Sequence, residues 1–253
     1  MISSYITGGL GNQLFMISTG LSLARDTNQK YALCSNLLSL WKCGTGEHPT
    51  KNLRTLYKKI DVVETCKLQV LKQQCPAHVY KKLPHKKNVF LKGWFQSEKY
   101  FKHNKQLLLD TYDFSHVKPL DLDLENFCSI HVRRGDFKLY DQFYYLPEVY
   151  YENAIKKTNQ SKFLVFSNDI SWCKTFFGSS DQFVYMDTDP VSSIHYMSQC
   201  GSNIIANSTF SWWGAWLNKS SDNQVVCPRV WFNPNHPSSK ARHDLYSNTW
   251  LRV

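Results

Sequence analysis

The order of apolar and polar positions at the start of the chain follows the pattern of a strand, a turn and a helix. Residues 2–7 predict a short strand, which ends at the glycine-rich turn of residues 8–11. Apolar side chains then recur at helical spacing over residues 13–24, and residues 31–34 predict a second strand. The pattern therefore predicts a β-α-β unit whose helix follows a glycine loop.

The second half of the chain alternates between short apolar runs and helix-like stretches. The runs predict strands at residues 127–132, 162–166, 183–186, 202–206 and 224–227, and the stretches predict helices at residues 147–157, 191–200 and 211–217. This alternation indicates an α/β fold with parallel sheets, in which ligand chemistry lies at the carboxyl ends of the strands.

The middle of the chain is less regular. Residues 42–87 are rich in Lys and Gln and predict short helices and loops, whereas residues 89–91 predict a buried strand and residues 97–109 a helix. The composition around residues 119–123 is acidic and loop-like. We place a domain boundary there, between a domain of residues 1–122 and a domain of residues 123–253.

Composition narrows the class of protein. The 253 residues are 42% hydrophobic and 15% aromatic, which excludes an intrinsically disordered chain. No run approaches the roughly 18 apolar residues of a membrane-spanning helix, and the first residues lack the basic start and apolar core of a signal peptide. We therefore expect a soluble, cytoplasmic protein.

The formal net charge of +10 fits three kinds of partner, namely nucleic acid, an anionic membrane or a small anionic ligand. Many basic residues lie in the first half, where a solvated lysine-rich surface is the simpler interpretation. The 8 cysteines contain no C-x-x-C pair and no cluster with histidines, so we expect no zinc site. Buried, reduced thiols are the expected state.

The glycine loop suits an anion. Gly8, Gly9 and Gly11 let a ligand approach the backbone, and the free amides at the start of the next helix favour negative charge. Leu14 stands where the dinucleotide fingerprint requires a third glycine, which disfavours a nicotinamide enzyme. A tight turn without a ligand is the alternative interpretation.

A second cluster, His131-Val132-Arg133-Arg134-Gly135-Asp136, lies at the end of a predicted strand. Two adjacent arginines near a buried strand are costly to desolvate unless an anion meets them, and guanidinium groups match phosphate oxygens. The alternative is an Arg–Asp ion pair that serves the structure.

Two further strand ends carry polar side chains. Asp169 is expected to cap a helix, although a carboxylate there can also accept hydrogen bonds from guanine or ribose. Ser208, Thr209 and Phe210 begin a helix and offer a second set of amides for phosphate. We expect the nearby Trp213 and Trp216 to pack in the core.

Two D-x-D pairs raise the question of a metal ion. Asp121 and Asp123 lie in the predicted linker, and Asp187 and Asp189 follow a predicted strand, where the next residue, Pro190, suits a helix start. Since the arginines can neutralise a diphosphate without a metal, we expect no metal and no other cofactor.

Taken together, the motifs resemble the inverting α-1,2-fucosyltransferases, which transfer L-fucose from GDP-L-fucose. The matching pieces, in family order, are residues 8–15, 91–101, 131–136, 167–169 with Trp172, and 207–217. The resemblance implies two facing Rossmann-like domains with parallel sheets, the glycosyltransferase-B type, with the acceptor on the N-terminal side and the GDP-sugar in the C-terminal domain. The short middle and the lack of a membrane anchor point to a soluble microbial or viral form.

The resemblance also implies roles for individual residues. Arg133 would contact the β-phosphate of the donor, and Asn12 would reach the diphosphate from across the cleft. Asp169 would bind guanosine. The remaining donor contacts would come from Gly9, Gly11, His131, Arg134, Ser208, Thr209 and Phe210. Met16 and Phe137 are local departures from the family pattern.

The reaction implied is inverting transfer of fucose to the 2-hydroxyl of a galactose-type acceptor, with GDP-fucose and a glycan as partners. Asp136 is one candidate for the general base, and an Asn12-assisted route in which the departing phosphate takes the proton is the other. Alternatives are another nucleotide-sugar transferase, with a different acceptor hydroxyl or a metal-dependent D-x-D site, a basic nucleic-acid-binding protein, and a Trp-rich carbohydrate-binding module.

Overall fold

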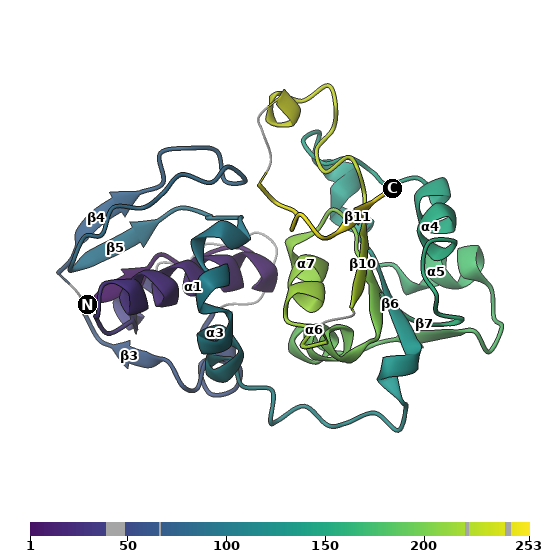
Figure 1. Ribbon diagram of the computed structural model, residues 1–253, viewed down its shortest axis with the longest axis horizontal. Helices are drawn as coiled ribbons and strands as arrows, with labels where there is room; N and C mark the ends of the chain where they lie inside the picture. Colours follow the sequence, from purple (N-terminus) through teal and green to yellow (C-terminus); the bar gives the residue numbers. More distant parts are fainter. Residues whose placement is uncertain (39–48, 66, 221–222, 241–243) are drawn as a thin grey trace. The chain divides into compact units, whose positions relative to one another are not determined.

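The computed structural model describes residues 1–38, 49–65, 67–220, 223–240 and 244–253. The chain forms two compact units, Met1–His116 with Arg242–Ser247, and Val117–Ala241 with Asn248–Val253 (Figure 1). A C-terminal segment therefore returns to the first unit before the chain ends in the second. The boundary at residues 122/123 stays a prediction.

The first unit begins with the expected strand, glycine loop, helix and strand. These are β1 (Ile2–Ser4), α1 (Leu10–Asp26) and β2 (Ala32–Cys34). β1 pairs in parallel with β5 (Val89–Lys92), which pairs in parallel with β4 (Gln69–Lys72). β2 pairs in parallel with β3 (Asp61–Val63). Helix α1 is buried on most of its circumference, including its polar residues Gln13, Ser18, Thr19 and Ser22.

Two expectations for the first unit need correction. Residues 42–87 contain the strands β3 and β4, which are largely exposed and hold only two consecutive apolar residues each, too short a run to predict a strand. The helix expected over residues 97–109 is instead two 3₁₀ turns, Glu98–Tyr100 and Lys102–Asn104, followed by α3 (Lys105–Thr111). The remaining elements are α2 (Ser35–Leu38) and the 3₁₀ turn Pro49–Asn52.

The second unit is a six-stranded, all-parallel sheet in the order β11-β10-β9-β6-β7-β8. The strands are β6 (Phe127–Val132), β7 (Lys162–Ser167), β8 (Phe183–Met186), β9 (Ser202–Ile204), β10 (Gln224–Cys227) and β11 (Leu251–Arg252). The helices are α4 (Glu148–Ile155), α5 (Ile170–Phe177), α6 (Pro190–Gln199) and α7 (Thr209–Trp216). Short 3₁₀ turns lie at Leu124–Asn126, Gly135–Leu139 and Pro237–Lys240.

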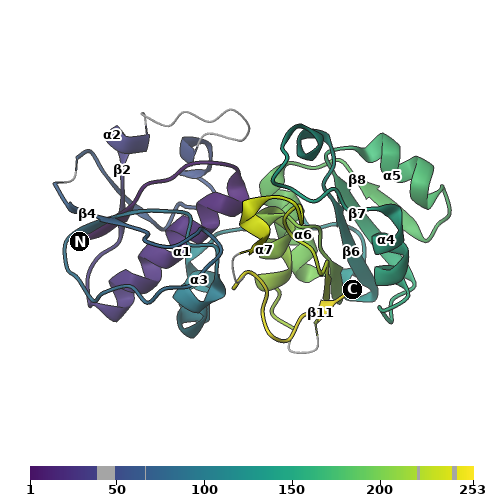
Figure 2. The same ribbon diagram turned by 90° about the horizontal axis from the view of Figure 1, so that it is seen from above.

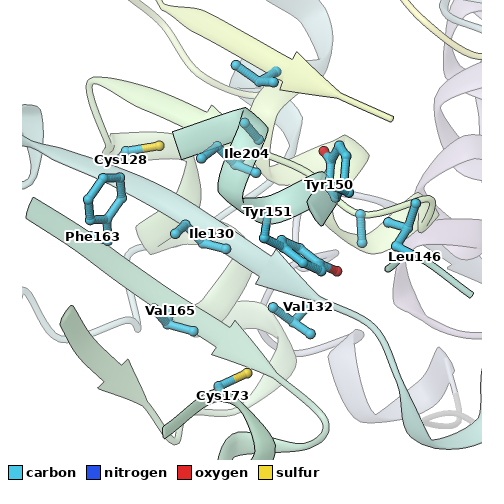
Figure 3. Packing of buried hydrophobic residues seen from close by; sticks show 13 residues of the cluster. Cys128, Ile130, Val132, Leu146, Tyr150, Tyr151, Phe163, Val165, Cys173 and Ile204 are labelled. Atoms are coloured by element: carbon cyan, nitrogen blue, oxygen red, sulfur yellow. The ribbon is translucent and has the colours of Figure 1, made fainter. Parts of the chain in front are cut away.

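Helices cover both faces of this sheet, with α4 and α5 on one face and α6 and α7 on the other (Figures 1 and 2). All six residues of β6 are buried, as expected for the centre of a covered parallel sheet. Cys128, Ile130 and Val132 pack on the α4/α5 face with Tyr151 of α4 and Cys173 of α5 (Figure 3).

On the opposite face, Trp212, Trp213 and Trp216 of α7 are buried and contact one another, with ring centroids 5.1 to 6.0 Å apart. The prediction that Trp213 and Trp216 belong to the core is confirmed. Within the described part of the chain, no helix has the length and apolarity needed to cross a membrane.

The cysteines match the expectation of free thiols with one exception. Cys128, Cys173, Cys200 and Cys227 are free and buried, and burial raises the pKa of the Cys173 thiol to about 11. Cys75 is free and half-buried. Cys34 is disulfide-bonded, so the expectation of reduced thiols is wrong at this position. Cys43 and Cys66 lie outside the described residues.

Candidate functional site

The strand order of the second unit places its candidate site between β6 and β9. From β6 the chain runs outward through β7 and β8, then returns to the other side of β6 and runs outward again through β9 and β10. In open parallel sheets, ligands bind beyond the carboxyl ends of the strands where the order reverses in this way. His131 near the end of β6 and Phe210 in the first turn of α7 meet there, with ring centroids 5.3 Å apart.

Side chains alternate between the two faces of β6. Ile130 and Val132 face α4 and α5, whereas His131 faces α7. The two arginines lie beyond the end of the strand and contact different residues. Arg134 packs against Trp172 of α5, whereas the Arg133 guanidinium lies over the Phe137 ring.

Arg133 follows β6 directly and is half-buried, with its guanidinium carbon 5.7 Å from the centroid of the Phe137 ring. Its charge acts on His131. Burial, and secondly the nearby Arg133, lower the pKa of His131 to about 3, so the imidazole is neutral at physiological pH. Its Nδ1 atom is buried without a hydrogen-bond partner. Arg133 therefore places a positive charge near His131, at the end of β6.

Arg134 is fixed by its neighbours in the protein. Its guanidinium carbon lies 3.8 Å from the ring centroid of Trp172 and 4.7 Å from that of Tyr145, and its Nε lies 3.5 Å from the carboxylate of Asp169. Its backbone amide donates to Oδ1 of Asn168 at 2.9 Å. This is the structural ion pair that the sequence left open. The predicted contact of Arg134 with the donor stays a prediction.

Asp169 caps helix α5, as the sequence predicted. Its Oδ1 accepts a hydrogen bond from the backbone amide of Trp172 at 3.1 Å, and the carboxylate also pairs with Arg134. The side chain remains 34% exposed, so a contact with guanosine stays a prediction.

The start of α7 lies beside His131 and offers backbone amides. Ser208 is the N-cap residue, and its Oγ accepts from the amide of Phe210 at 3.3 Å. Asn207 fixes the preceding loop by donating to the carbonyls of Tyr144 and Trp231 at 2.7 and 2.8 Å. Thr209 is the first residue of the helix. The amides and the dipole at a helix start favour phosphate.

The loop between the arginines and α4 contains Asp136 in the 3₁₀ turn Gly135–Leu139. The side chain of Asp136 lies outside what the structure describes, and its role as a base stays a prediction. Gly135 has φ +26°, and a Cβ there would lie 2.7 Å from Nδ2 of Asn168. Glycine is therefore required to bring this loop close to the end of β7.

In the first unit, the glycine loop joins β1 to α1. Gly9 is the N-cap residue without a side-chain cap, and Gly11 is buried in the first turn. Gly8 has φ +76°, and a Cβ there would lie 2.9 Å from Nδ2 of Asn12. Oδ1 of Asn12 accepts from Nε2 of Gln96 at 2.9 Å. The predicted approach of Asn12, Gly9 and Gly11 to a diphosphate stays a prediction.

The D-x-D pairs have structural roles. Asp189 caps α6 by accepting from the amides of Val191 and Ser192 at 2.9 and 3.1 Å. Asp123 accepts from Nδ2 of Asn126 at 2.6 Å. Among the described residues, no group of three or more His, Cys, Asp and Glu side chains is arranged to hold a metal ion. That the reaction needs no metal stays a prediction.

Sequence reasoning missed two contributors to this region. Tyr145 stacks on Arg134, and Asn168 holds the Arg134 amide. The aromatic run at residues 143–145 was the available signal for the first, and the Ser167-Asn168-Asp169 strand end for the second.

Comparisons with known proteins bear on both the fold and the family. The model for "Glycosyl transferase family 11" matches residues 45–253. An Escherichia coli protein named alpha-1,2-colitosyltransferase is 27% identical, over 100% of this chain and 99% of its own length. The Escherichia coli O-antigen biosynthesis glycosyltransferase WbnK is 34% identical over 60% of this chain, and the match spans about half of that relative, 53% of its length.

Solved structures are similar in fold. The crystal structure of NodZ alpha-1,6-fucosyltransferase soaked with GDP-fucose has a TM-score of 0.58, with 11% identity over 93% of this chain and 97% of its own. The structure of NodZ from Bradyrhizobium has a TM-score of 0.52, with 11% identity over 84% and 92%. These likenesses confirm the α/β, glycosyltransferase-B class with parallel sheets.

Proposed function

The chain belongs to glycosyl transferase family 11, and on that premise we propose that it is a galactoside α-1,2-fucosyltransferase with GDP-L-fucose as donor. The observation that carries the proposal is the contact of His131 with Phe210 in the first turn of α7, at the switch point of the sheet, with the charge of Arg133 acting on His131. The solved neighbour whose title names GDP-fucose supports this donor. The α-1,2 linkage in the name of the colitosyltransferase supports the 2-hydroxyl as the acceptor.

In the proposed complex, Arg133 and the amides of Ser208 and Thr209 bind the diphosphate, together with the Phe210 amide once it exchanges its 3.3 Å bond to Oγ of Ser208 for a phosphate oxygen. The planar guanidinium offers paired donors for phosphate oxygens, and the helix start adds partial positive charge. Asp169, one-third exposed at the end of β7, faces the position we propose for guanosine. Gly9, Gly11 and Asn12 complete the donor contacts from the first unit.

The reaction is a displacement at the anomeric carbon of fucose. The 2-hydroxyl oxygen of galactose attacks that carbon, and the bond from the carbon to the β-phosphate oxygen breaks with inversion. The electron pair goes to the leaving GDP, where negative charge develops in the transition state. Preorganised donors aimed at that charge are the main source of rate, so Arg133 is the residue on which turnover depends most.

The acceptor proton goes either to Asp136 or to the departing phosphate in a route assisted by Asn12. His131 is not proposed as the base. Its pKa of about 3 makes it a weak acceptor at physiological pH, whereas an effective general base has a pKa near the working pH. His131 instead fills the space between β6 and Phe210.

The proposal is tested by incubating the protein with GDP-fucose and a panel of galactosides, glucosides and N-acetylhexosaminides, followed by linkage analysis of the product. We expect GDP release and a fucose at O2 of a galactoside. Fucose at another hydroxyl would correct the linkage while keeping the donor. No consumption of GDP-fucose with any acceptor would overturn the proposal.

A further inference from the structure

The turn after β5 holds a tryptophan in an unusual position. Trp94 is 39% exposed, although its neighbour Phe95 is fully buried. An exposed aromatic side chain is common on protein surfaces and by itself indicates nothing. Phe95, however, has φ +49°. This left-handed backbone conformation is rare for bulky residues and is energetically unfavourable. This left-handed residue directly follows Trp94, so the exposed tryptophan lies in a tight turn after β5.

Several contacts hold the turn rigid. Oε1 of Gln73 accepts from the amides of Trp94 and Phe95 at 2.9 and 3.0 Å, so one side chain binds both. The amide of Gln96 donates to the carbonyl of Ala77 at 2.8 Å. The ring of Phe95 packs edge-on against Tyr100, with centroids 5.4 Å apart.

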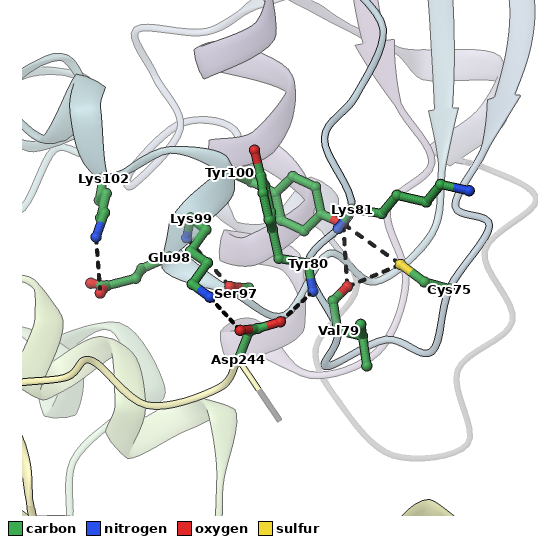
Figure 4. A network of polar contacts seen from close by, with 10 residues as sticks. All are labelled: Cys75, Val79, Tyr80, Lys81, Ser97, Glu98, Lys99, Tyr100, Lys102 and Asp244. Carbon is green, nitrogen blue, oxygen red and sulfur yellow. Dashed lines mark hydrogen bonds and ion pairs between the residues drawn. The ribbon is translucent and has the colours of Figure 1, made fainter. Parts of the chain in front are cut away.

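A polar network fixes the residues that follow (Figure 4). Asp244 pairs with Lys99 and accepts from the amide of Tyr80 at 2.8 Å. The hydroxyl of Tyr100 accepts from the amide of Lys81 at 3.1 Å. The backbone of the turn carrying Trp94 is thus braced from both sides and needs little ordering when a ligand binds, which favours affinity.

The surroundings of Trp94 combine an aromatic face with amide groups. Its ring lies 3.0 Å from where a Cβ on Gly8 would be, so the glycine makes room for the indole. Gln96, two residues on, donates to Asn12 at 2.9 Å, which brings two carboxamide side chains to the same end of β1 and β5. An exposed ring on a braced turn, with carboxamides beside it, matches a pyranose, which offers C–H groups on one face and hydroxyls at its edge.

We propose that Trp94 is the stacking platform for the pyranose ring of the acceptor. The inference rests on the proposed function, because it gives the acceptor of that reaction its binding site. It places acceptor recognition in the first unit, on the carboxyl ends of β1 and β5. Gln96 is the neighbouring side chain that would meet the sugar hydroxyls.

The experiment measures saturation-transfer NMR of methyl β-D-galactopyranoside, and of the matching glucoside and N-acetylglucosaminide, with no donor present. Wild type is compared with Trp94→Ala, with Trp94→Phe, which keeps an aromatic face, and with Val70→Ala, an exposed apolar control on β4 of the same sheet. We expect Trp94→Ala to weaken binding of the recognised sugar about three- to tenfold. Trp94→Phe should retain most of the binding and Val70→Ala all of it.

Equal binding by Trp94→Ala and wild type, with circular dichroism showing both folded, would overturn the inference. So would a wild type that binds none of the three sugars. Parallel incubation with GDP-fucose separates this outcome from failure of the proposed function. Sugar binding that depends on Trp94, without consumption of GDP-fucose, would support the platform and reject fucose transfer. Consumption of GDP-fucose by a protein whose sugar binding is unchanged in Trp94→Ala would reject the platform and support fucose transfer.

Discussion

Replacing Arg134 by alanine should destabilise the protein far more than replacing its neighbour Arg133. The Arg134 side chain is only 14% exposed and its guanidinium lies over two rings, at 3.8 and 4.7 Å. Each partly desolvated cation–π contact contributes about 0.5–1 kcal/mol or somewhat more. The pair with Asp169, whose carboxylate is one-third exposed, adds less than ~1 kcal/mol. The expected loss of unfolding free energy for Arg134→Ala is therefore about 2 kcal/mol.

The assay is urea denaturation of wild type, Arg134→Ala, Arg134→Lys and Arg133→Ala, together with GDP release from GDP-fucose. Arg134→Lys keeps the charge over Trp172 but loses the planar stacking, so it should lie between wild type and the alanine variant. Arg133→Ala should lose less stability, because the cation–π contact of Arg133 with Phe137, at 5.7 Å, is longer than those of Arg134.

One outcome would contradict the structural role assigned to Arg134. If Arg134→Ala is as stable as wild type but loses turnover as completely as Arg133→Ala does, Arg134 is a donor ligand and its contacts with Trp172 and Tyr145 do not fix it. Similar losses of stability in both variants would remove the distinction between the two arginines.

Three further predictions concern the same unit. The pKa of His131 is lowered to about 3 in the folded state from an unfolded value near 6.5, so the unfolded state becomes protonated at a higher pH than the folded state does. The stability that depends on neutral His131 should thus be complete above about pH 6.5 and fall by up to ~1.4 kcal/mol per pH unit between there and pH ~3. Urea denaturation at several pH values should show this pH dependence of the unfolding free energy in wild type but not in His131→Asn. The same pH dependence in both proteins would refute the prediction. Gly135→Ala should lower the unfolding free energy by about 1–3 kcal/mol, since φ is positive and Asn168 lies 2.7 Å from the new Cβ; urea curves identical to wild type would contradict this. EDTA should leave GDP release unchanged, because Asp189 is used as a helix cap; inactivation that added Mg²⁺ or Mn²⁺ reverses would restore a metal-dependent mechanism.

The buried elements of the fold are predictable from the sequence, and the exposed ones are not. β6, β8 and β10 have the bounds that the apolar runs predict, because strands in a covered parallel sheet carry continuous apolar residues. β3 and β4 expose most of their side chains, and β11 has two residues, so none of the three leaves such a run.

The loops that form the candidate site were predictable from the sequence, but the separate roles of the residues within them were not. Strand ends and the helix cap at Asp169 follow from local pattern. The different roles of Arg133 and Arg134 depend on where each side chain lies beyond the end of β6. They also depend on Trp172 and Tyr145, which come from other segments of the chain. Tertiary contacts of this kind leave no local signal. The strained turn at Phe95 was likewise hidden, because nothing in Gly93-Trp94-Phe95-Gln96 marks a positive φ.

The central claim is that Arg133 stabilises the charge on the departing GDP, and one comparison tests it most directly. GDP release from GDP-fucose with a galactoside is measured for wild type, Arg133→Ala and Arg229→Ala, an exposed arginine of the same unit as the matched control. Loss of one such donor typically costs about 10²–10³ in rate. We expect that loss in Arg133→Ala, with less loss of stability than in Arg134→Ala, and full turnover in Arg229→Ala. Turnover of Arg133→Ala equal to that of wild type would contradict the account.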